Sequence, residues 1–413
     1  MIVAFSIFLE EKIMQKGKYC LLRMVNANAN NNKEYEMIQL SDSKFEARWG
    51  RVEGSKATRI YSMDKWYSIY DSKIKKGYQD VTEFVSVKTT ITSQYAPIED
   101  EAVAQLIEEI LRYANEFVKS TYKIDKNSVT QAMIFEAQRL IDELNYYANC
   151  NNLQGFNYIL SQLFVVIPRK MKDVYEHLAK TDSDFTEIMQ REQDTLDTLK
   201  SVVATNSCDS SSSDGKKTIL DAFGIKIRLC TDEERENCKK KLSSESEHLL
   251  DKAFRIEIDA LEKKNARYMK ENGLTRKNFH FFYHGTRNEN VWSILKTGLV
   301  LNPKEIFTGK LFGYGLYFAQ RAKKSIGYTS LRGTRWANGT SDRGYLFVMK
   351  VAYKNPYDVY SWGNNLSTFR EKDIKALGCD ALFAHKGQML VNDEVIVYNG
   401  GAVVPRYLLT LKQ

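Results

Sequence analysis

The sequence has few cysteines, few prolines and no long hydrophobic run. Its six cysteines are scattered over 413 residues without CxxC or CxxH spacing, so neither a zinc site nor a disulfide framework is indicated. The longest mostly apolar run, Met1 to Leu9, is too short to span a bilayer and lacks the basic start of a signal peptide. We therefore expect a soluble chain in a reducing compartment, with no metal and no membrane partner. We expect Met1 to Leu9 to form a first strand or an ordered tail.

Two common nucleotide-binding motifs are also missing. Gly313-Tyr314-Gly315 lacks the third glycine and the following helix of a Rossmann turn, and no Walker A sequence occurs. From Thr218 onward, short strand-forming runs follow one another with few helices between them, which favours a mixed, mainly antiparallel α+β domain. The expected elements are strands at Ile219 to Arg228, Ala253 to Ile258, Gly344 to Val351, Glu394 to Tyr398 and Arg406 to Leu409, and a charged helical stretch from Asp232 to Lys252.

Composition points to a multidomain globular protein. Apolar residues make up 43% of the chain and charged residues 27%, and 413 residues exceed what one hydrophobic core usually serves. We expect two or three domains. The net charge of +8 is compatible with a polyanionic partner but does not establish one.

The N-terminal part reads as a small basic β module. Short β-type runs between Lys18 and Val87 enclose an amphipathic helix expected over Asp64 to Lys76. Between Lys44 and Lys76, nine Lys or Arg residues stand against four Asp or Glu, which favours contact with phosphate. The alternative is that Trp49 is a half-buried sheet residue and that the lysines form a solvated face.

The middle of the chain predicts an all-helical unit. Apolar residues recur at helical spacing in Val103 to Ala114, Val129 to Leu144 and Phe156 to Val166, and further helical residues follow Asp173. The stretch from Ser207 to Gly215 is polar and of low complexity, which is typical of a linker. An exposed serine run of this kind is usually just flexible chain.

The most informative stretch runs from Phe279 to Tyr328. An apolar run ends on His284-Gly285-Thr286, which predicts a buried strand with a histidine at its end. A short helix is expected at Asn290 to Lys296, with Gly298 just past its end. Gly313-Tyr314-Gly315 then precedes a strand-like Leu316 to Ala319.

These motifs, HG[ST]…GxGxYF…KSxxY followed by Asn392 to Tyr398, resemble the catalytic domain of the poly(ADP-ribose) polymerases. Members of that family are NAD-consuming ADP-ribosyltransferases with a His-Tyr-Glu signature, on which His284, Tyr317 and Glu394 fall. Arg48 to Val52 resembles the WGR domain of the DNA-dependent members. Leu163 to Pro168 resembles part of the helical regulatory subdomain that those members place before the catalytic domain.

The resemblance implies a four-part layout: a WGR module with an N-terminal extension at 1–96, an autoinhibitory helical subdomain at 97–205, a Ser-rich linker at 206–217, and an α+β transferase domain at 218–413. It also implies that NAD is a co-substrate, that no cofactor is permanently bound, and that nicotinamide is released. The implied catalytic residues are His284, Tyr317 and Glu394. The residues implied to bind NAD are His284, Gly285, Thr286, Tyr317, Phe318, Ala319, Lys324, Ser325 and Tyr328.

In that arrangement Glu394 stabilises an oxocarbenium-like ribose and orients the acceptor. Tyr328 and Tyr317 stack on nicotinamide, the backbone of Gly285 and the Ser325 hydroxyl bind its amide, and His284 binds the adenosine ribose. Lys324 falls on a lysine that the family keeps near the acceptor side.

The implied partners are DNA with strand breaks, held by Trp49, Gly50 and Arg51, and protein acceptors that include the chain itself. Arg51 would serve either DNA or the neighbouring domain. The implied setting is DNA repair, in a eukaryotic nucleus or at a prokaryotic nucleoid; the oligomeric state is not predicted.

Lys304 to Lys310 is shorter than the usual donor loop, and Lys310-Leu311 replaces an aromatic-methionine pair, so mono-ADP-ribosylation stays open. A non-catalytic DNA-end scaffold is the third alternative.

Overall fold

The computed structural model describes residues 18–84, 95–124, 128–207, 211–212, 215–242, 244–301, 311–361, 363–387 and 390–413. Packing divides the chain into two compact units, residues 1–92 with 116–206 and residues 93–115 with 207–413. Met1 to Leu9 and the donor loop at Lys304 to Lys310 lie outside the described residues. The four-part domain layout stays a prediction.

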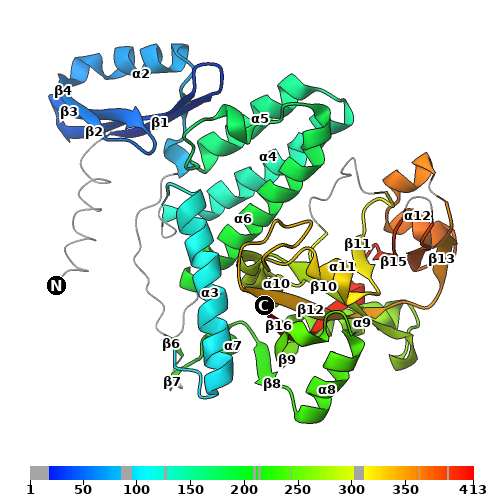
Figure 1. The fold of residues 1–413 in the computed structure, drawn as a ribbon. Coiled ribbons are helices and arrows are strands. Elements are labelled where there is room, and N and C mark those ends of the chain that lie inside the picture. The colour runs from blue at the N-terminus through cyan, green and yellow to red at the C-terminus, as the bar shows by residue number, and fades with distance from the viewer. Residues whose placement is uncertain are drawn as a thin grey trace. The chain divides into compact units, whose positions relative to one another are not determined.

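The first unit contains a five-stranded antiparallel sheet in the order β4-β3-β2-β1-β5 (Figure 1). The helix α2 packs on it: Trp66 is buried and meets Phe45 edge to face, with 5.0 Å between the ring centroids. The β-type runs and the helix expected here are confirmed. The elements are β1 (Tyr19–Asn26), β2 (Asn31–Ser41), β3 (Lys44–Arg51), β4 (Ala57–Ser62), α2 (Trp66–Lys75) and β5 (Gln79–Asp80).

Helices dominate the next part of the chain, as the apolar spacing predicts. They are α3 (Glu101–Thr121), α4 (Gln131–Asn149), α5 (Leu153–Val166) and α6 (Phe185–Ser207). The Thr130 side chain caps α4 by accepting a hydrogen bond from the Met133 amide. Helix α5 ends just before Pro168, which disfavours a helical residue ahead of it. Phe156 of α5 stacks on Phe185 of α6 at 4.2 Å and joins these helices.

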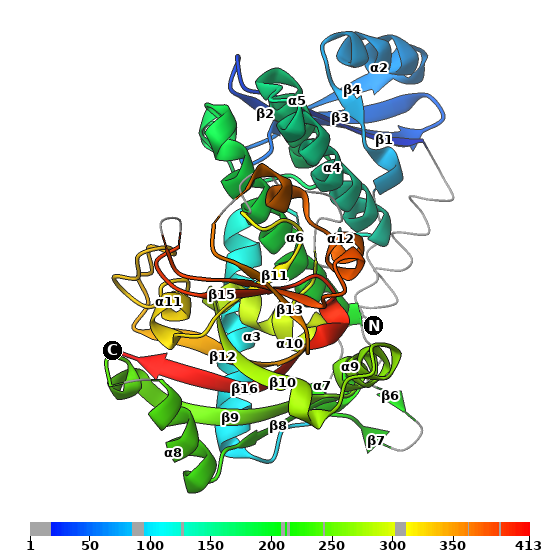
Figure 2. The same cartoon turned by 90° about the vertical axis from the view of Figure 1, so that its right-hand side faces the viewer.

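The second unit is built on a nine-stranded sheet in the order β13-β14-β15-β11-β10-β12-β16-β9-β8 (Figure 2). Among the described strands, β13 and β14 pair in parallel and the other neighbours pair antiparallel. This confirms a mixed, mainly antiparallel α+β domain. The strands are β8 (Ile225–Leu229), β9 (Leu250–Ile258), β10 (Phe279–Thr286), β11 (Leu316–Ala319), β12 (Arg343–Ala352), β13 (Pro356–Val359), β14 (Ala381–Ala384), β15 (Glu394–Val397) and β16 (Val403–Lys412).

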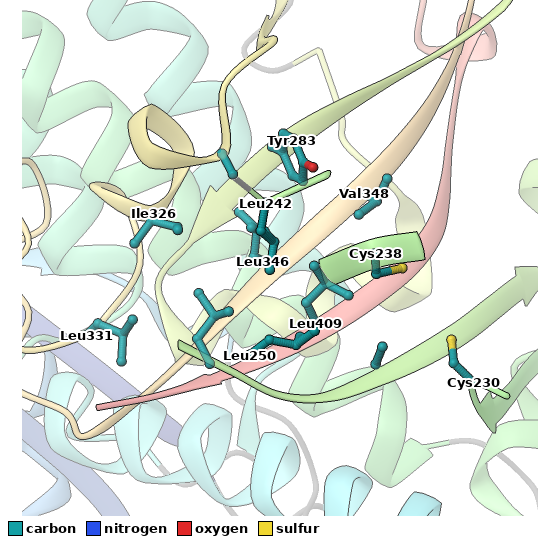
Figure 3. Packing of buried hydrophobic residues seen from close by; sticks show 13 residues of the cluster. Cys230, Cys238, Leu242, Leu250, Tyr283, Ile326, Leu331, Leu346, Val348 and Leu409 are labelled. Atoms are coloured by element: carbon teal, nitrogen blue, oxygen red, sulfur yellow. The ribbon is translucent and has the colours of Figure 1, made fainter. Parts of the chain in front are cut away.

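An apolar core holds two helices against one face of this sheet (Figure 3). Cys238 of α8 and Ile326 of α11 pack with Leu346 of β12 and Leu409 of β16, both fully buried. Burying such a leucine stabilises the fold by about 1.5–3 kcal/mol. Helix α11 is therefore fixed beside β10, where the histidine motif ends. Besides the first part of α3, the described α-helices of this unit are α7 (Ile219–Ala222), α8 (Asp232–Lys241), α9 (Asp259–Glu271), α10 (Val291–Thr297), α11 (Ala322–Ile326) and α12 (Glu371–Ala376).

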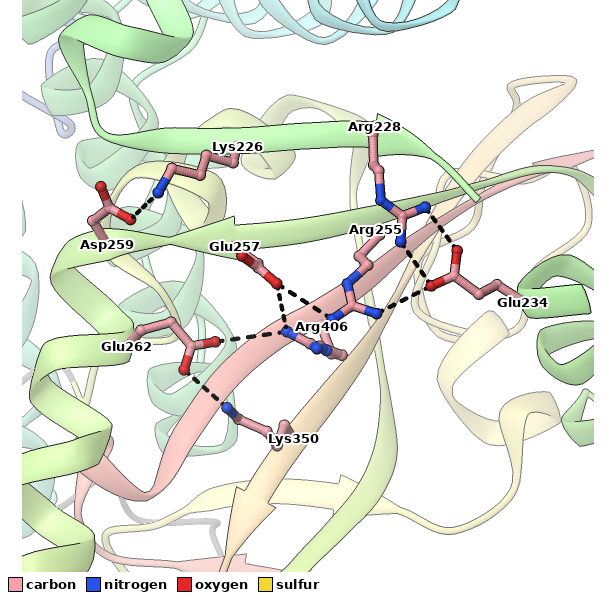
Figure 4. A network of polar contacts seen from close by, with 9 residues as sticks. All are labelled: Lys226, Arg228, Glu234, Arg255, Glu257, Asp259, Glu262, Lys350 and Arg406. Carbon is pink, nitrogen blue, oxygen red and sulfur yellow. Dashed lines mark hydrogen bonds and ion pairs between the residues drawn. The ribbon is translucent and has the colours of Figure 1, made fainter. Parts of the chain in front are cut away.

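Alternating charges cross the β8, β9 and β16 part of the sheet (Figure 4). Glu234 of α8 binds Arg228 at 2.7 Å and Arg255 at 3.1 Å, while Glu257 binds Arg406 at 3.2 Å. The Arg228 guanidinium is the main reason why the pKa of Glu234 falls to about 2. Because these pairs are partly exposed, each contributes only about 0–1 kcal/mol. The main effect of these ion pairs is therefore to balance the charge on this part of the sheet, and they add little to the stability of the fold.

Two expectations about the start of the second unit are wrong. Ile219 to Arg228 is not one strand, because Thr218 and Asp221 form a capping box that starts α7. Gly224, with φ of 61°, then turns the chain into β8. The helical stretch expected from Asp232 to Lys252 ends at Lys241, and β9 begins at Leu250. Within the predicted linker, Ser211–Ser212 pairs with Gly215–Lys216 in a short ladder.

The described helices include none that is both long enough and apolar enough to cross a membrane. No group of three or more His, Cys, Asp or Glu side chains suited to a metal ion occurs in the described part of the chain.

Candidate active site

The three signature residues lie on three neighbouring strands, in the order β15-β11-β10. Ala319 of β11 pairs with Glu394 of β15 and with Tyr283 of β10, and Tyr317 pairs with Ile396. Paired residues share a face and successive residues alternate. Tyr317 and Glu394 therefore project from one face of the sheet. His284, next to Tyr283, alternates to the other face.

Helix α11 brings two polar side chains to the face that holds Glu394. The Lys324 ammonium donates to Oε1 of Glu394, a carboxylate that is only 8% exposed. Burial lowers the pKa of Lys324 below its ordinary value. The buried Ser325 hydroxyl donates to the carbonyl oxygen of Tyr283 at 3.0 Å. A carboxylate and an amine thus meet at this end of the sheet.

Strands β10 and β11 separate next to this pair. They pair at Tyr283, whereas β10 continues to pair with β12 through His284, Gly285 and Thr286. Along the described strands, the β11 side of Gly285 therefore has no strand partner. A Cβ atom at Gly285 would lie 1.7 Å from the carbonyl oxygen of Ser325, so α11 can approach only a glycine here. Thr286 is buried at the end of the strand.

Tyr317 is held by the loop that leads into β11. Its hydroxyl donates to the Gly313 carbonyl at 2.9 Å and accepts from the Phe312 amide at 3.1 Å. Gly313 has φ of 71°, a left-handed conformation that favours glycine. The neighbouring Phe318 is 1% exposed and packs on Phe282, and Ala319 is 6% exposed. Their backbone, rather than their side chains, is the part suited to contact a ligand.

His284 is half-buried. Desolvation lowers its pKa to about 4, so the imidazole is neutral at physiological pH. A neutral imidazole offers one donor and one acceptor nitrogen, which suits a hydroxyl-bearing ligand such as a ribose.

Tyr328 is 44% exposed just after α11 and stacks on Trp336, with ring centroids 6.0 Å apart and planes 15° apart. The motifs did not indicate Trp336. It lies in a loop without hydrophobic periodicity, and its ring contact depends on how that loop closes.

The residues predicted to bind DNA lie in the other unit. Trp49 is partly exposed and stacks on Tyr35 at 5.7 Å. Gly50 packs against the backbone of Ser55 so closely that a Cβ atom on Gly50 would lie 2.6 Å from the Ser55 carbonyl oxygen. The Arg51 guanidinium donates to the carbonyl oxygens of Asn30, Met171 and Lys172 at 2.5, 3.3 and 3.2 Å. Arg51 thus contacts the segment after α5, and the DNA-binding roles stay predictions.

The family model of the poly(ADP-ribose) polymerase catalytic domain matches residues 232–413. The uncharacterized protein 101L of Invertebrate iridescent virus 6 is 32% identical over 188 residues, which cover 46% of this chain and 79% of that protein. Poly [ADP-ribose] polymerase 2 of Arabidopsis thaliana is 28% identical over 160 residues, 33% of this chain. The match spans only 24% of the plant protein.

Proposed function

Because the chain belongs to the poly(ADP-ribose) polymerase family and is an NAD ADP-ribosyltransferase, we propose that His284, Tyr317 and Glu394 form its active site. We propose further that DNA breaks activate it and that it builds poly(ADP-ribose) on protein acceptors, itself included. The main support for this site is the hydrogen bond between Lys324 and Glu394, next to the gap between β10 and β11.

The transfer breaks the bond between ribose C1′ and the nicotinamide nitrogen. The electron pair of that bond goes to the cationic ring, so nicotinamide leaves neutral and needs no proton donor. The ribose gains oxocarbenium character, which a nearby carboxylate stabilises. Glu394 is suited to this role because it is buried and because Lys324 fixes one of its oxygens. The same carboxylate hydrogen-bonds the incoming acceptor hydroxyl and takes its proton as the new bond forms.

The nicotinamide ring occupies the gap beside Gly285. Gly285 pairs with Leu346 of β12 but has no described strand partner on its β11 side, which leaves this side of the backbone open to the amide of the ligand. Ser325 accepts a further hydrogen bond, and Tyr328 stacks on the ring with an attraction of about 0.5–2 kcal/mol while the ring is cationic. Tyr317, which projects from the same face as Glu394, also stacks on the ring.

His284 and Thr286 bind the adenosine side of NAD. Alternation along β10 directs His284 away from the face that holds Glu394, which fits contact with the far ribose rather than with nicotinamide. Neutral imidazole supplies both a donor and an acceptor to ribose hydroxyls.

Activation by DNA is proposed from the first unit. The partly exposed Trp49 suits stacking on a terminal nucleotide, worth about 1–3 kcal/mol, and the surrounding lysines and arginines suit phosphate. Arg51 donates to the carbonyls of Met171 and Lys172, and Arg23 donates to those of Val165 and Val166. These bonds tie the β module to the helical segment, so DNA bound to the module can act on the helices that restrain the transferase.

Polymer is the proposed product because position 394 carries a glutamate able to orient a ribose hydroxyl as acceptor. Leu311, in place of the family's methionine, packs together with Tyr317 against a buried apolar cluster that includes Phe312. This change affects the site that receives a growing chain, so mono-ADP-ribosylation is the second candidate.

Labelled NAD, added with nicked DNA or with an intact closed circle, tests the whole proposal. We expect long ladders of modified protein with nicked DNA and far fewer with the circle. Single modifications in place of ladders would show that the product is mono-ADP-ribose and not polymer. Equal labelling with both DNAs would contradict activation by breaks. DNA binding without any turnover of NAD would indicate a non-catalytic DNA-end scaffold.

A further inference from the structure

Trp336 packs against Tyr328, the residue that the proposed function assigns to stacking on nicotinamide. The Tyr328 and Trp336 rings lie nearly parallel, 15° apart, with 6.0 Å between centroids. Trp336 is 52% exposed, and the Arg335 guanidinium lies 4.8 Å from the centroid of its ring. Because the Tyr328 side chain stays 44% exposed under this contact, its ring remains accessible for stacking on a ligand.

The backbone around Trp336 is built to hold this contact. The amides of Trp336 and Ala337 both donate to the carbonyl oxygen of Gly327, at 3.0 and 3.1 Å. The indole approaches so closely that a Cβ atom on Gly327 would lie 2.8 Å from its Cδ1 atom. The residue before Tyr328 is thus a glycine at the position where the indole packs.

The loop that carries Trp336 is itself closed by hydrogen bonds. The Arg332 amide donates to the Ser341 carbonyl at 2.8 Å, and the Gly333 amide donates to the Gly339 carbonyl at 3.1 Å. The Thr334 hydroxyl donates to the Thr329 carbonyl at 2.9 Å and anchors the loop to the end of the α11 segment. These bonds hold the indole in place before any ligand arrives.

We propose that Trp336 is a positioning residue for NAD: it holds the Tyr328 ring in the orientation that stacks on nicotinamide. This inference rests on the proposed role of Tyr328. An exposed tyrosine ring without a neighbour would have to be ordered when NAD binds, whereas a ring already stacked on Trp336 is ordered in advance. Trp336 acts through Tyr328 and does not touch the reacting atoms.

Steady-state kinetics of the full chain with NAD test this role. Trp336→Ala should raise KM for NAD roughly threefold to tenfold, the range expected for one aromatic pair, with kcat within about twofold. Trp336→Phe should restore most of the loss, because it keeps an aromatic ring. In the Tyr328→Ala background, Trp336→Ala should have no further effect, since the two residues act as a unit.

Tyr360→Ala is the matched control. Tyr360 is 73% exposed in the same unit and stacks on His385 at 4.1 Å, so its loss also removes an exposed aromatic pair. It should leave KM unchanged. If Tyr328→Ala raises KM but Trp336→Ala does not, the inference fails and the proposed function stands. If Tyr328→Ala leaves KM unchanged, the proposed role of Tyr328 is wrong, and the inference about Trp336 that rests on it is wrong as well. If Trp336→Phe is as impaired as Trp336→Ala, and both lower kcat and the melting temperature, the role of Trp336 is structural and the inference is overturned.

Discussion

Lowering the pH should destabilise the catalytic unit through His284, and the loss should extend well below the usual range for a histidine. Desolvation lowers the pKa of His284 from 6.5 to about 4. The unfolded chain therefore binds this proton more readily than the folded chain. The contribution of the neutral imidazole to stability is complete above pH 6.5, and it is lost as the pH falls from 6.5 towards 4. From the two pKa values, this loss is about 3 kcal/mol.

Urea unfolding of the wild type and of His284→Gln, measured from pH 7.5 to pH 4, tests this value. The glutamine cannot take up a proton in this range, so the difference in unfolding free energy between the two proteins should change by about 3 kcal/mol. His385→Gln removes a histidine at the end of β14 and controls for loss of an imidazole as such; it should keep the wild-type loss at low pH. Parallel curves for the wild type and His284→Gln would refute the reasoning.

The same pKa makes a prediction about binding. Because His284 is neutral well below pH 6.5, KM for NAD should be constant from about pH 5.5 to 8. An inflection near pH 6.5 that disappears in His284→Gln would show that the imidazole titrates like an exposed histidine, contrary to its burial.

Three further changes have defined outcomes. Gly285→Ala places a Cβ atom 1.7 Å from the Ser325 carbonyl oxygen, so it should displace α11 and abolish NAD turnover; full activity with an unchanged melting temperature would contradict the packing. Arg169→Ala removes an ion-pair partner of Glu192, which is 3% exposed, and should cost about 3 kcal/mol of stability in the first unit, measured by calorimetry; a change below about 1 kcal/mol would disprove this. Trp49→Ala should weaken activation by nicked DNA and leave DNA-independent transfer intact; loss of both together would contradict a separate DNA-binding module.

Much of the fold was predictable because local patterns and tertiary packing agree. The helical spacing in Phe156 to Val166 corresponds to α5, and the apolar run before His284 corresponds to β10. The prediction of one strand over Ile219 to Arg228 failed because the capping box at Thr218 starts a short helix there and the positive φ of Gly224 then turns the chain into β8.

The motifs name the residues proposed for the site but do not give their geometry. The motifs named Glu394 and Lys324, and the structure adds that α11 brings the two side chains into contact. That contact depends on strand order and on burial of α11, which no local spacing encodes. The stacking of Trp336 on Tyr328 likewise depends on hydrogen bonds that close a loop.

The central claim is that the Glu394 carboxylate stabilises the ribose from which nicotinamide departs. The most direct measurement is the rate of nicotinamide release from NAD in the presence of nicked DNA, for the wild type and for Glu394→Gln. Glutamine keeps the size of the side chain but loses its charge, so we expect kcat to fall by about 10²–10³-fold and polymer ladders to vanish, with NAD still bound. Nicotinamide release and ladders unchanged from the wild type would contradict the account.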